Sequence, residues 1–338
     1  MIASKKNQLI LLVTILQFCT AGARAQEDIP STTQNERYAI DRNFFKFPNG
    51  RVIGSAPSID ISPDGKRILV IDRCSANDCV GSDLDPILEF DLSGELIRSF
   101  GSNLFIRPHG LHVDYLGNIW VTDGEGPNDT DPRRMGKGHQ VFKFSPLGEL
   151  LMTLGSAGIA GNGEYEFNEP SDVVVAPNGD IFVGDGHGGN SNARIVKYSG
   201  DGTYISSWGR KGTGTGEFEA PHTLAMDSRG RLFVGDRGNS LVQIFDQDGV
   251  FLEEWSDLGQ PSGIYIDSND ILYVTDATSR VSASRGIRIA STTDGVVFNF
   301  IPDTEETASQ EGIVVDSSGT IYGASTRGMS LQKYTKLD

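Results

Sequence analysis

Two histidines stand at equivalent places in a repeated pattern, and they are the residues of this chain most suited to hold a metal ion. His109 and His222 lie in Pro108–Leu111 and Pro221–Leu224, each eight residues before a predicted turn. The same spacing places Glu311 before the last such turn. Two imidazoles and a carboxylate suit zinc or iron, with positions left open for water or substrate. The chain has five histidines, so a shared register for two of them favours a common role over chance.

Three further side chains are candidates for the chemistry itself. Arg73 and Arg237 each follow an aspartate at the end of a predicted strand, and His187 follows the Asp185-Gly186 pair. A guanidinium could hold a carboxylate or an oxyanion, and an imidazole could act as general acid or base. The alternatives are structural: hydrogen bonds that cap turns for the metal-site histidines, and ion pairs with the repeated aspartates for the arginines.

A unit that repeats along the chain would position these residues. Each unit has an apolar strand, a Gly or Asp turn, a second apolar strand that ends near Asp, and two further strands. The second unit shows the pattern best, with strands predicted over 108–114, 119–123, 140–144 and 150–155. A small sheet of this kind cannot bury both of its faces alone, so such units stack around an axis. The six predicted turn residues are Gly65, Gly117, Gly179, Gly230, Asp270 and Gly319.

The repeat therefore predicts an all-β fold, a six-bladed β-propeller. The last blade ends at Leu331–Tyr334 without room for a fourth strand. An N-terminal strand, predicted at Asn43–Phe47, is expected to complete it and to close the ring.

Blade geometry then brings the candidates together. The first strand of each blade crosses from one face to the other and the second strand returns, so all the candidates are expected on one face near the axis. Alternate blades of such a ring lie about 120° apart. His109, His222 and Glu311 belong to blades two, four and six, and they can therefore converge on one central ion.

The N-terminus predicts export. A basic lysine pair precedes an apolar stretch over 9–18, and a small-x-small cleavage site lies at 23–25. We expect a signal peptide over 1–25, a disordered leader over 26–40 and the propeller over 41–338. The apolar stretch is short for a transmembrane helix, although an uncleaved N-terminal anchor is the alternative. A secreted or periplasmic protein without membrane contact after cleavage is expected.

Export also affects the interpretation of the cysteines and the charge. Cys74 and Cys79 lie five residues apart, and in an oxidising compartment they predict a disulfide, with two free thiols as the alternative. The formal net charge of −16 argues against nucleic acid or an anionic membrane as partner. A monomer that binds a small-molecule or peptide-end substrate is expected.

At these same residues the chain resembles the peptidyl-α-hydroxyglycine α-amidating lyases, which are NHL-repeat propellers. The resemblance runs from about Arg51 to the C-terminus. The pieces that carry it are Pro108–Leu111, His139–Phe144, Asp185–His187, Pro221–Ala225 and Gly235–Arg237. It implies a central zinc, held in that family by three histidines, and cleavage of an α-hydroxyglycine amide into an amide and glyoxylate. By this resemblance His109 and His222 match two zinc ligands, while Arg73 and Arg237 match arginines of the substrate site.

The chain departs from the family pattern at three positions. Glu311 stands in place of the third zinc histidine, and His187 stands in place of an active-site tyrosine. Gly312 replaces an aspartate that helps to hold calcium in the family, which argues against calcium here. We therefore expect an exported, metal-dependent carbon–nitrogen lyase with an altered ligand and base, and zinc or iron as cofactor. Two alternatives stay open: a metal-dependent hydrolase of a small metabolite, and a non-enzymatic NHL propeller that binds a protein or a glycan.

Overall fold

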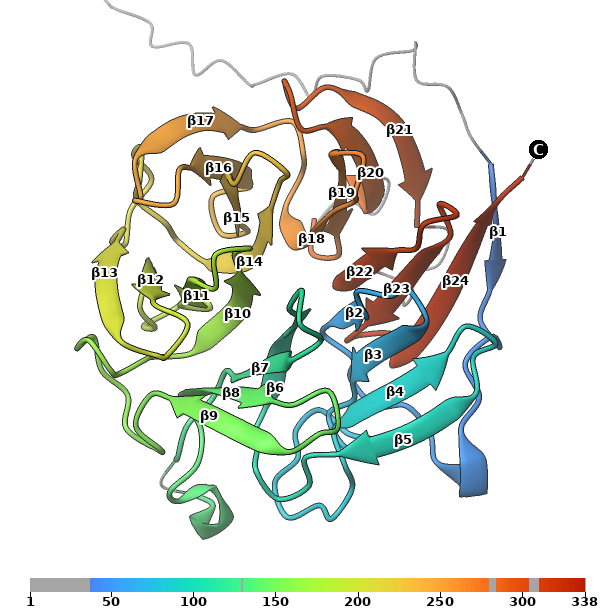
Figure 1. The fold of residues 1–338 in the computed structure, drawn as a ribbon, viewed down its shortest axis with the longest axis horizontal. Coiled ribbons are helices and arrows are strands. Elements are labelled where there is room, and N and C mark those ends of the chain that lie inside the picture. Colours follow the sequence, from blue (N-terminus) through green and yellow to red (C-terminus); the bar gives the residue numbers. More distant parts are fainter. Residues whose placement is uncertain (1–36, 129, 280–283, 304–309, 338) are drawn as a thin grey trace, which may run out of the picture. The chain divides into compact units, whose positions relative to one another are not determined.

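The described part of the protein consists of six antiparallel sheets arranged around an axis (Figure 1). The computed structural model describes residues 37–128, 130–279, 284–303 and 310–337. Each sheet in these residues has four strands, with the first strand of each blade innermost, which confirms the predicted six-bladed β-propeller.

The strands follow the predicted repeat. The innermost strands are β2 (Ile59–Ile61), β6 (Pro108–Val113), β10 (Pro170–Val175), β14 (Pro221–Met226), β18 (Pro261–Ile266) and β22 (Gly312–Val315). The second strands are β3 (Arg67–Ile71), β7 (Ile119–Asp123), β11 (Ile181–Asp185), β15 (Leu232–Asp236), β19 (Ile271–Asp276) and β23 (Ile321–Ser325). The third strands are β4 (Ile87–Asp91), β8 (Gln140–Phe144), β12 (Arg194–Tyr198), β16 (Leu241–Phe245), β20 (Gly286–Ser291) and β24 (Ser330–Lys336). The outermost strands are β5 (Leu96–Phe100), β9 (Leu150–Leu154), β13 (Tyr204–Trp208), β17 (Phe251–Trp255), β21 (Val297–Pro302) and, in the last blade, β1 (Tyr38–Asp41).

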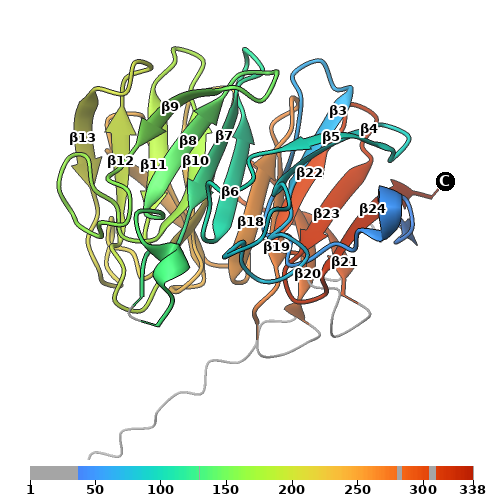
Figure 2. The ribbon, with the colours of Figure 1, turned by 90° about the horizontal axis from the view of Figure 1, so that it is seen from below.

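In the described part of the chain, two short 3-10 helices lie in connections between strands, η1 (Pro48–Gly50) and η2 (Pro132–Arg134). Figure 2 shows η2 at the edge of the strands, in the long connection between β7 and β8. Within the described residues, no helix is both long and apolar enough to cross a membrane.

The turns between the first and second strands lie where the sequence predicts them. All six predicted turn residues have positive φ, for example Gly117 at 82° and Asp270 at 58°. Such a φ is uncommon for a residue with a side chain. The Asp270 carboxylate offsets this cost, because it accepts hydrogen bonds from the backbone and the hydroxyl of Ser228 in the neighbouring blade.

The core lies between the blades. One buried cluster joins Leu69 and Ile71 of β3 to Phe142 and Phe144 of β8. Stacking thus removes from water the apolar faces that a single blade would expose, as expected for repeat units of this size.

An N-terminal strand closes the ring, but its position differs from the prediction. The strand is β1, which pairs with β24 in antiparallel register from Tyr38↔Lys336 to Asp41↔Lys333. The predicted strand Asn43–Phe47 was wrong, because this segment makes one isolated bridge, from Lys46 to Glu95, and its aromatic residues pack between the first and last blades. Phe45 is buried against the rings of Phe90 and Tyr322, at centroid distances of 5.0 Å and 6.1 Å.

This position also moves the N-terminal boundary of the propeller. The predicted disordered leader, residues 26–40, overlaps β1 at its last three residues. The remainder of the leader and the predicted signal peptide, residues 1–25, lie outside the described residues.

The cysteine pair follows β3. The sulfur atoms of Cys74 and Cys79 lie 2.00 Å apart, at disulfide distance, as predicted.

Candidate metal centre

Local irregularities turn the candidate histidines toward the axis. In β6 and β14 the strand register shifts at His109 and His222, and in β10 and β18 the same shift occurs at Ser171 and Ser262. A β-bulge of this kind changes the direction of a side chain and is common near functional sites. The two imidazoles are therefore aimed by a backbone feature that four blades share.

The repeated aspartates hold the bulged segments in place. Asp123 accepts hydrogen bonds from the backbone N–H groups of Ile106 and Arg107, at 2.9 Å and 2.6 Å. Asp236 accepts one from Ala220 at 2.9 Å, in the equivalent place before His222. These buried carboxylates tie the end of each second strand to the start of the first strand, which positions the histidines.

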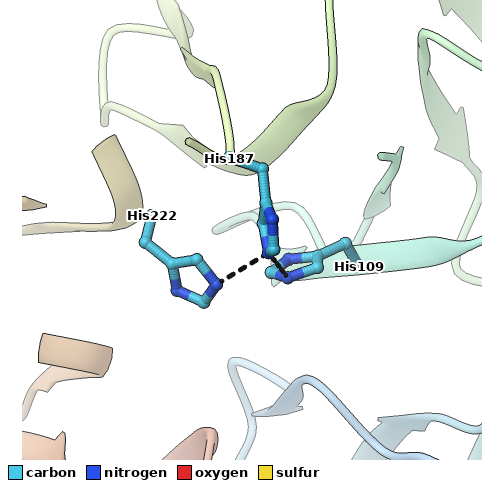
Figure 3. A group of neighbouring side chains, drawn as sticks. All are labelled: His109, His187 and His222. Carbon is cyan, nitrogen blue, oxygen red and sulfur yellow. Dashed lines mark hydrogen bonds between the residues drawn. The ribbon is translucent and has the colours of Figure 1, made fainter. Parts of the chain in front are cut away.

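Three histidines meet at the axis (Figure 3). Nε2 of His187 lies 3.2 Å from Nε2 of His109 and 3.2 Å from Nε2 of His222. His187 comes from the loop after β11, while the other two come from innermost strands. Glu311, just before β22, places Oε1 at 3.4 Å from Nε2 of His109 and 3.7 Å from Nε2 of His222. His187 and Glu311 are thus two further potential metal ligands close to the pair His109 and His222.

Backbone carbonyls orient two of the imidazoles. Nδ1–H of His109 donates to the carbonyl of Ser171 at 2.8 Å, and Nδ1–H of His222 donates to the carbonyl of Ser262 at 2.8 Å. This tautomer leaves the lone pair on Nε2, which faces the axis. Both hydrogen bonds run to the next blade, so each imidazole joins two blades.

The protonation states suit a cation. Burial lowers the pKa of His109, and it lowers the pKa of His187 and of His222 well below the ordinary value. Burial alone would raise the pKa of Glu311, but the adjacent imidazole of His109 and the charges of neighbouring groups outweigh it and hold this pKa well below its usual range. Neutral imidazoles beside an ionised carboxylate are the forms that bind metals.

The spacing also fits a metal ion. Zinc–nitrogen bonds are about 2.0–2.1 Å long, so neighbouring ligands of a tetrahedral zinc ion are about 3.3–3.4 Å apart. The nitrogen–nitrogen distances of 3.2 Å agree with that geometry. The histidine triad can therefore hold a metal ion.

Arg73 is buried beside the histidines without a carboxylate partner. Its Nε donates to the carbonyl of Pro108 at 3.0 Å, and Nη1 donates to Ser55 and Asn77 at 3.3 Å. Nη2 is buried and has no hydrogen-bond partner in the described structure. Burial, together with the charge of Arg107, lowers the pKa of Arg73 to about 10. An unsatisfied guanidinium nitrogen of this kind is a donor available to an anionic ligand.

Arg237 lies beside His187. Its Nη2 lies 3.4 Å from Nε2 of His187. Burial lowers the pKa of Arg237, although Glu311 opposes the shift. Within the described residues, neither Arg73 nor Arg237 forms an ion pair, so the alternative of pairing with the repeated aspartates is wrong. Other arginines take that role: Arg51 pairs with Asp72 and Arg194 pairs with Asp185.

A cavity of about 700 Å³ follows the axis from the opposite face. It begins among turn residues such as Gly65 and Gly319, and its lining ends at His109, His222 and Glu311. The two arginines and His187 follow second strands on the other side of the centre. The histidine triad therefore lies between an axial cavity and an arginine-lined face.

Comparisons with known proteins agree with this fold. A family model described as NHL repeat matches residues 167–198 and 218–245, in the third and fourth blades. NHL repeat-containing protein 3 of Homo sapiens is 30% identical over 270 residues, which cover 76% of this chain and 75% of that protein. The chain belongs to the NHL-repeat propeller family.

Other relatives of this NHL-repeat chain are named as lyases. Peptidyl-alpha-hydroxyglycine alpha-amidating lyase 1 of Drosophila melanogaster is 37% identical over 177 residues, which cover 48% of this chain and 30% of the fly protein. A solved streptogramin B lyase has the same fold, with a TM-score of 0.57 at 16% identity, covering 89% of this chain and 98% of that one. At that identity the likeness concerns the fold alone.

The structure brings all six predicted site residues of this NHL-repeat chain to the same end of the axis; their roles stay predictions. One difference concerns His187, predicted as an acid or base and found within ligand distance of His109 and His222. Its place directly after a second strand, like that of the two arginines, was the signal in the sequence. Thr326, which donates to Oε2 of Glu311 at 2.5 Å, was not predicted, since nothing in the sequence distinguishes it from other threonines.

Proposed function

We propose that this chain is an exported, metal-dependent lyase that acts on a small metabolite or on the end of a peptide. The observation that carries the proposal is the meeting of neutral histidines with two arginines, the buried Arg73 and the half-buried Arg237, at one end of the axis. The similarity to a protein named as an amidating lyase supports this class of reaction.

His109, His222 and Glu311 would hold the metal ion, with zinc or iron as the candidates. When bound, such an ion polarises an oxygen atom of the substrate as a Lewis acid. The carboxylate of Glu311 adds a negative charge to the ligand set. The ion should therefore be a weaker Lewis acid than it would be with three histidines alone.

His187 is the candidate for proton transfer. In an α-hydroxyglycine amide, the hydroxyl loses its proton and its oxygen forms the carbonyl of glyoxylate. The C–N bond breaks with its electron pair on nitrogen, and the nitrogen takes a proton to complete the amide, so no water is consumed. Nε2 of His187 is neutral and lies close to the proposed centre, so it can accept the hydroxyl proton and return it to the nitrogen.

Arg73 and Arg237 would hold the carboxylate of such a substrate. Nη2 of Arg73 has no partner in the described residues, and Nη2 of Arg237 lies 3.4 Å from Nε2 of His187. Charge-assisted hydrogen bonds to a carboxylate are about twice as strong as neutral ones. These two arginines would orient the substrate with its carboxylate beside the histidines.

The compartment belongs to the same proposal. The predicted signal peptide and the disulfide-distance pair Cys74 and Cys79 both favour an oxidising, extracytoplasmic location. A monomeric, secreted or periplasmic enzyme is the form we propose.

Metal content and product release test the proposal. The protein without residues 1–25 should bind about one zinc or iron ion per chain after reconstitution, measured by mass spectrometry. His222→Ala and Glu311→Ala should lose the ion, while His112→Asn, a change on the same strand as His109, should keep it. The parent should release glyoxylate from a peptidyl-α-hydroxyglycine.

Each adverse result has a distinct meaning. If the parent protein binds no metal after reconstitution, the proposal of a metal-dependent enzyme is rejected. A parent that binds metal but releases no glyoxylate would reject the lyase step and leave a metal-dependent hydrolase.

A non-enzymatic binding propeller is the second candidate. The human NHL repeat-containing protein 3 favours it, because that protein aligns with three quarters of this chain and its name states no reaction. Under this alternative the protein holds no metal, and His109→Ala leaves the binding of its protein or glycan partner unchanged.

A further inference from the structure

His187 is held less firmly than the other two histidines of the centre. The outer nitrogens of His109 and His222 are fixed by backbone carbonyls of the next blade. Among the described residues, Nδ1 of His187 has no hydrogen-bond partner. Since a hydrogen bond at the outer nitrogen normally fixes the orientation of a ligating imidazole, His187 lacks the usual restraint.

The backbone around His187 also differs from that of the other two. His109 and His222 lie on innermost strands, whereas His187 lies in a loop next to Gly186 and Gly188, whose φ values are 142° and 101°. Only glycine adopts such angles without strain. The backbone N–H of His187 donates to Oγ of Ser191 at 2.8 Å, which restrains the loop through its backbone and not through the imidazole ring.

Glu311, by contrast, is anchored on both sides. Its Oε2 accepts a hydrogen bond from Thr326 at 2.5 Å, and its backbone N–H donates to the carbonyl of Ala324 at 2.7 Å. The residue is buried. As a third metal ligand beside His109 and His222, Glu311 would therefore keep its position.

Nε2 of His187 faces two kinds of partner. It lies 3.2 Å from Nε2 of both His109 and His222, where a shared ion would sit, and 3.4 Å from Nη2 of Arg237. One lone pair can bind the ion or accept the hydrogen bond from Arg237, but not both. The imidazole of His187 therefore has two alternative partners close by, the ion and Nη2 of Arg237.

We propose that His187 is an exchangeable ligand: it binds the metal in the resting protein, and an anionic ligand displaces it onto Arg237. Displacement opens one position at the ion and passes the lone pair of His187 from the ion to the Nη2–H group of Arg237. This inference rests on the proposed function only in requiring that a metal ion is bound.

Cobalt(II) substitution tests the exchange, because the visible absorption of cobalt reports its coordination number. Acetate is the anionic probe. In the parent protein, acetate should change the spectrum saturably and remove one histidine from the ligand shell measured by X-ray absorption. His187→Ala should keep cobalt with an affinity within about tenfold of the parent, whereas His222→Ala should lose 100-fold or more. The resting spectrum of His187→Ala should differ from that of the parent, and acetate should bind this variant more tightly.

Three results would overturn the inference. One is loss of cobalt from His187→Ala as complete as from His222→Ala, which would make His187 a permanent ligand. Another is a resting spectrum identical to that of the parent, which would mean that His187 is no ligand. The third is an unchanged histidine count when acetate binds the parent.

Two further variants keep the test decisive. His187→Gln retains the bulk of the side chain and should behave like His187→Ala if the alanine variant folds poorly. His112→Asn should match the parent in every measurement. Failure of the parent to bind cobalt would overturn both the proposed metal centre and the exchange, whereas each of the three results above would overturn the exchange alone.

Discussion

Glu311 is a buried carboxylate whose ionisation depends on its immediate neighbours. Removal of a carboxylate from water favours its protonated form. The imidazoles of His109 and His222 and the charge of Arg73 lie nearby, and together they hold the pKa of Glu311 well below its usual range. A cation between Glu311 and the neutral histidines would be favoured by the same arrangement, because each donor already has the protonation state that a metal requires.

Replacement of this one charge gives the first prediction. Glu311→Gln should reduce metal affinity about 10- to 100-fold, a loss of the size seen when groups that support a metal site are removed. The fold should persist, because the amide oxygen can still accept from Thr326. Competition with a chelator measures the affinity and thermal unfolding checks the fold. Glu169→Gln, a change of the same chemistry on a half-buried side chain, is the control; equal affinities for parent and Glu311→Gln would show that the carboxylate is no ligand.

At the scale of the strand, β6 can aim His109 only because the next residue has no side chain. A Cβ on Gly110 would lie 2.5 Å from Oδ1 of Asp172 and 2.7 Å from the carbonyl of Ser171 in the neighbouring blade. The carbonyl of Ser171 is also the acceptor for Nδ1–H of His109. Close approach of the two blades and orientation of the imidazole thus depend on the same contact.

Gly110→Ala should therefore disturb both packing and the site. We expect an overpacking cost of about 1–3 kcal/mol in the free energy of unfolding, together with weaker metal binding because the carbonyl of Ser171 must move. Denaturant unfolding and metal titration measure the two effects. Gly163→Ala, where a new Cβ meets mainly the flexible side chain of Glu166, should change neither. Undiminished metal affinity in Gly110→Ala would contradict this account of how β6 positions the ligand.

The closing strand β1 should contribute to both stability and solubility. Removal of residues up to Asp41 would leave β24 as an exposed strand edge, which favours association with other chains. A ladder of this length should contribute about 2–4 kcal/mol to the free energy of unfolding. We expect a lower melting temperature and concentration-dependent association in size-exclusion chromatography. A protein that begins at Arg37 should behave like the parent. If the two truncated proteins are equally stable, the buried aromatic residues and not β1 hold the ring closed.

At the scale of the whole molecule, burial of the repeated aspartates links stability to pH. Burial raises the pKa of Asp123 to about 7 and also raises the pKa of Asp236. Each folded carboxyl group therefore retains its proton at a pH where the unfolded group, with an ordinary pKa of 3.8, has lost it. The stabilisation is complete below that ordinary value and is lost as the pH rises through the folded pKa.

The free energy of unfolding should consequently fall between about pH 4 and pH 7 and change less above that range. Chemical denaturation at a series of pH values measures the slope. Asp123→Asn should flatten the slope, while Asp83→Asn, an exposed change, should leave it nearly unaltered. A free energy of unfolding that rises over this pH range would contradict the proposed linkage.

Local signals predicted the repeat because they act over short distances. The turn residues, the strand alternation and the aspartates that end the second strands depend on neighbours within a few residues, so Gly117 and Asp123 take their predicted places. Counting from the turns then placed His109, His222 and Glu311 in equivalent positions. The closing strand was misplaced because the aromatic run at Asn43–Phe47 has the composition of a strand, while its burial depends on contacts with Phe90 and Tyr322 far along the chain.

The sequence by itself determined the class of fold and the residues that share one end of the axis, since periodicity fixes which side chains are equivalent. Only the tertiary structure decided how those residues meet. It placed His187 at ligand distance, left Arg73 without a carboxylate partner, and aimed His109 and His222 through carbonyls of the next blade. The physical reason is that these contacts join different blades, and their distances depend on bulges and side-chain packing that no repeat pattern specifies.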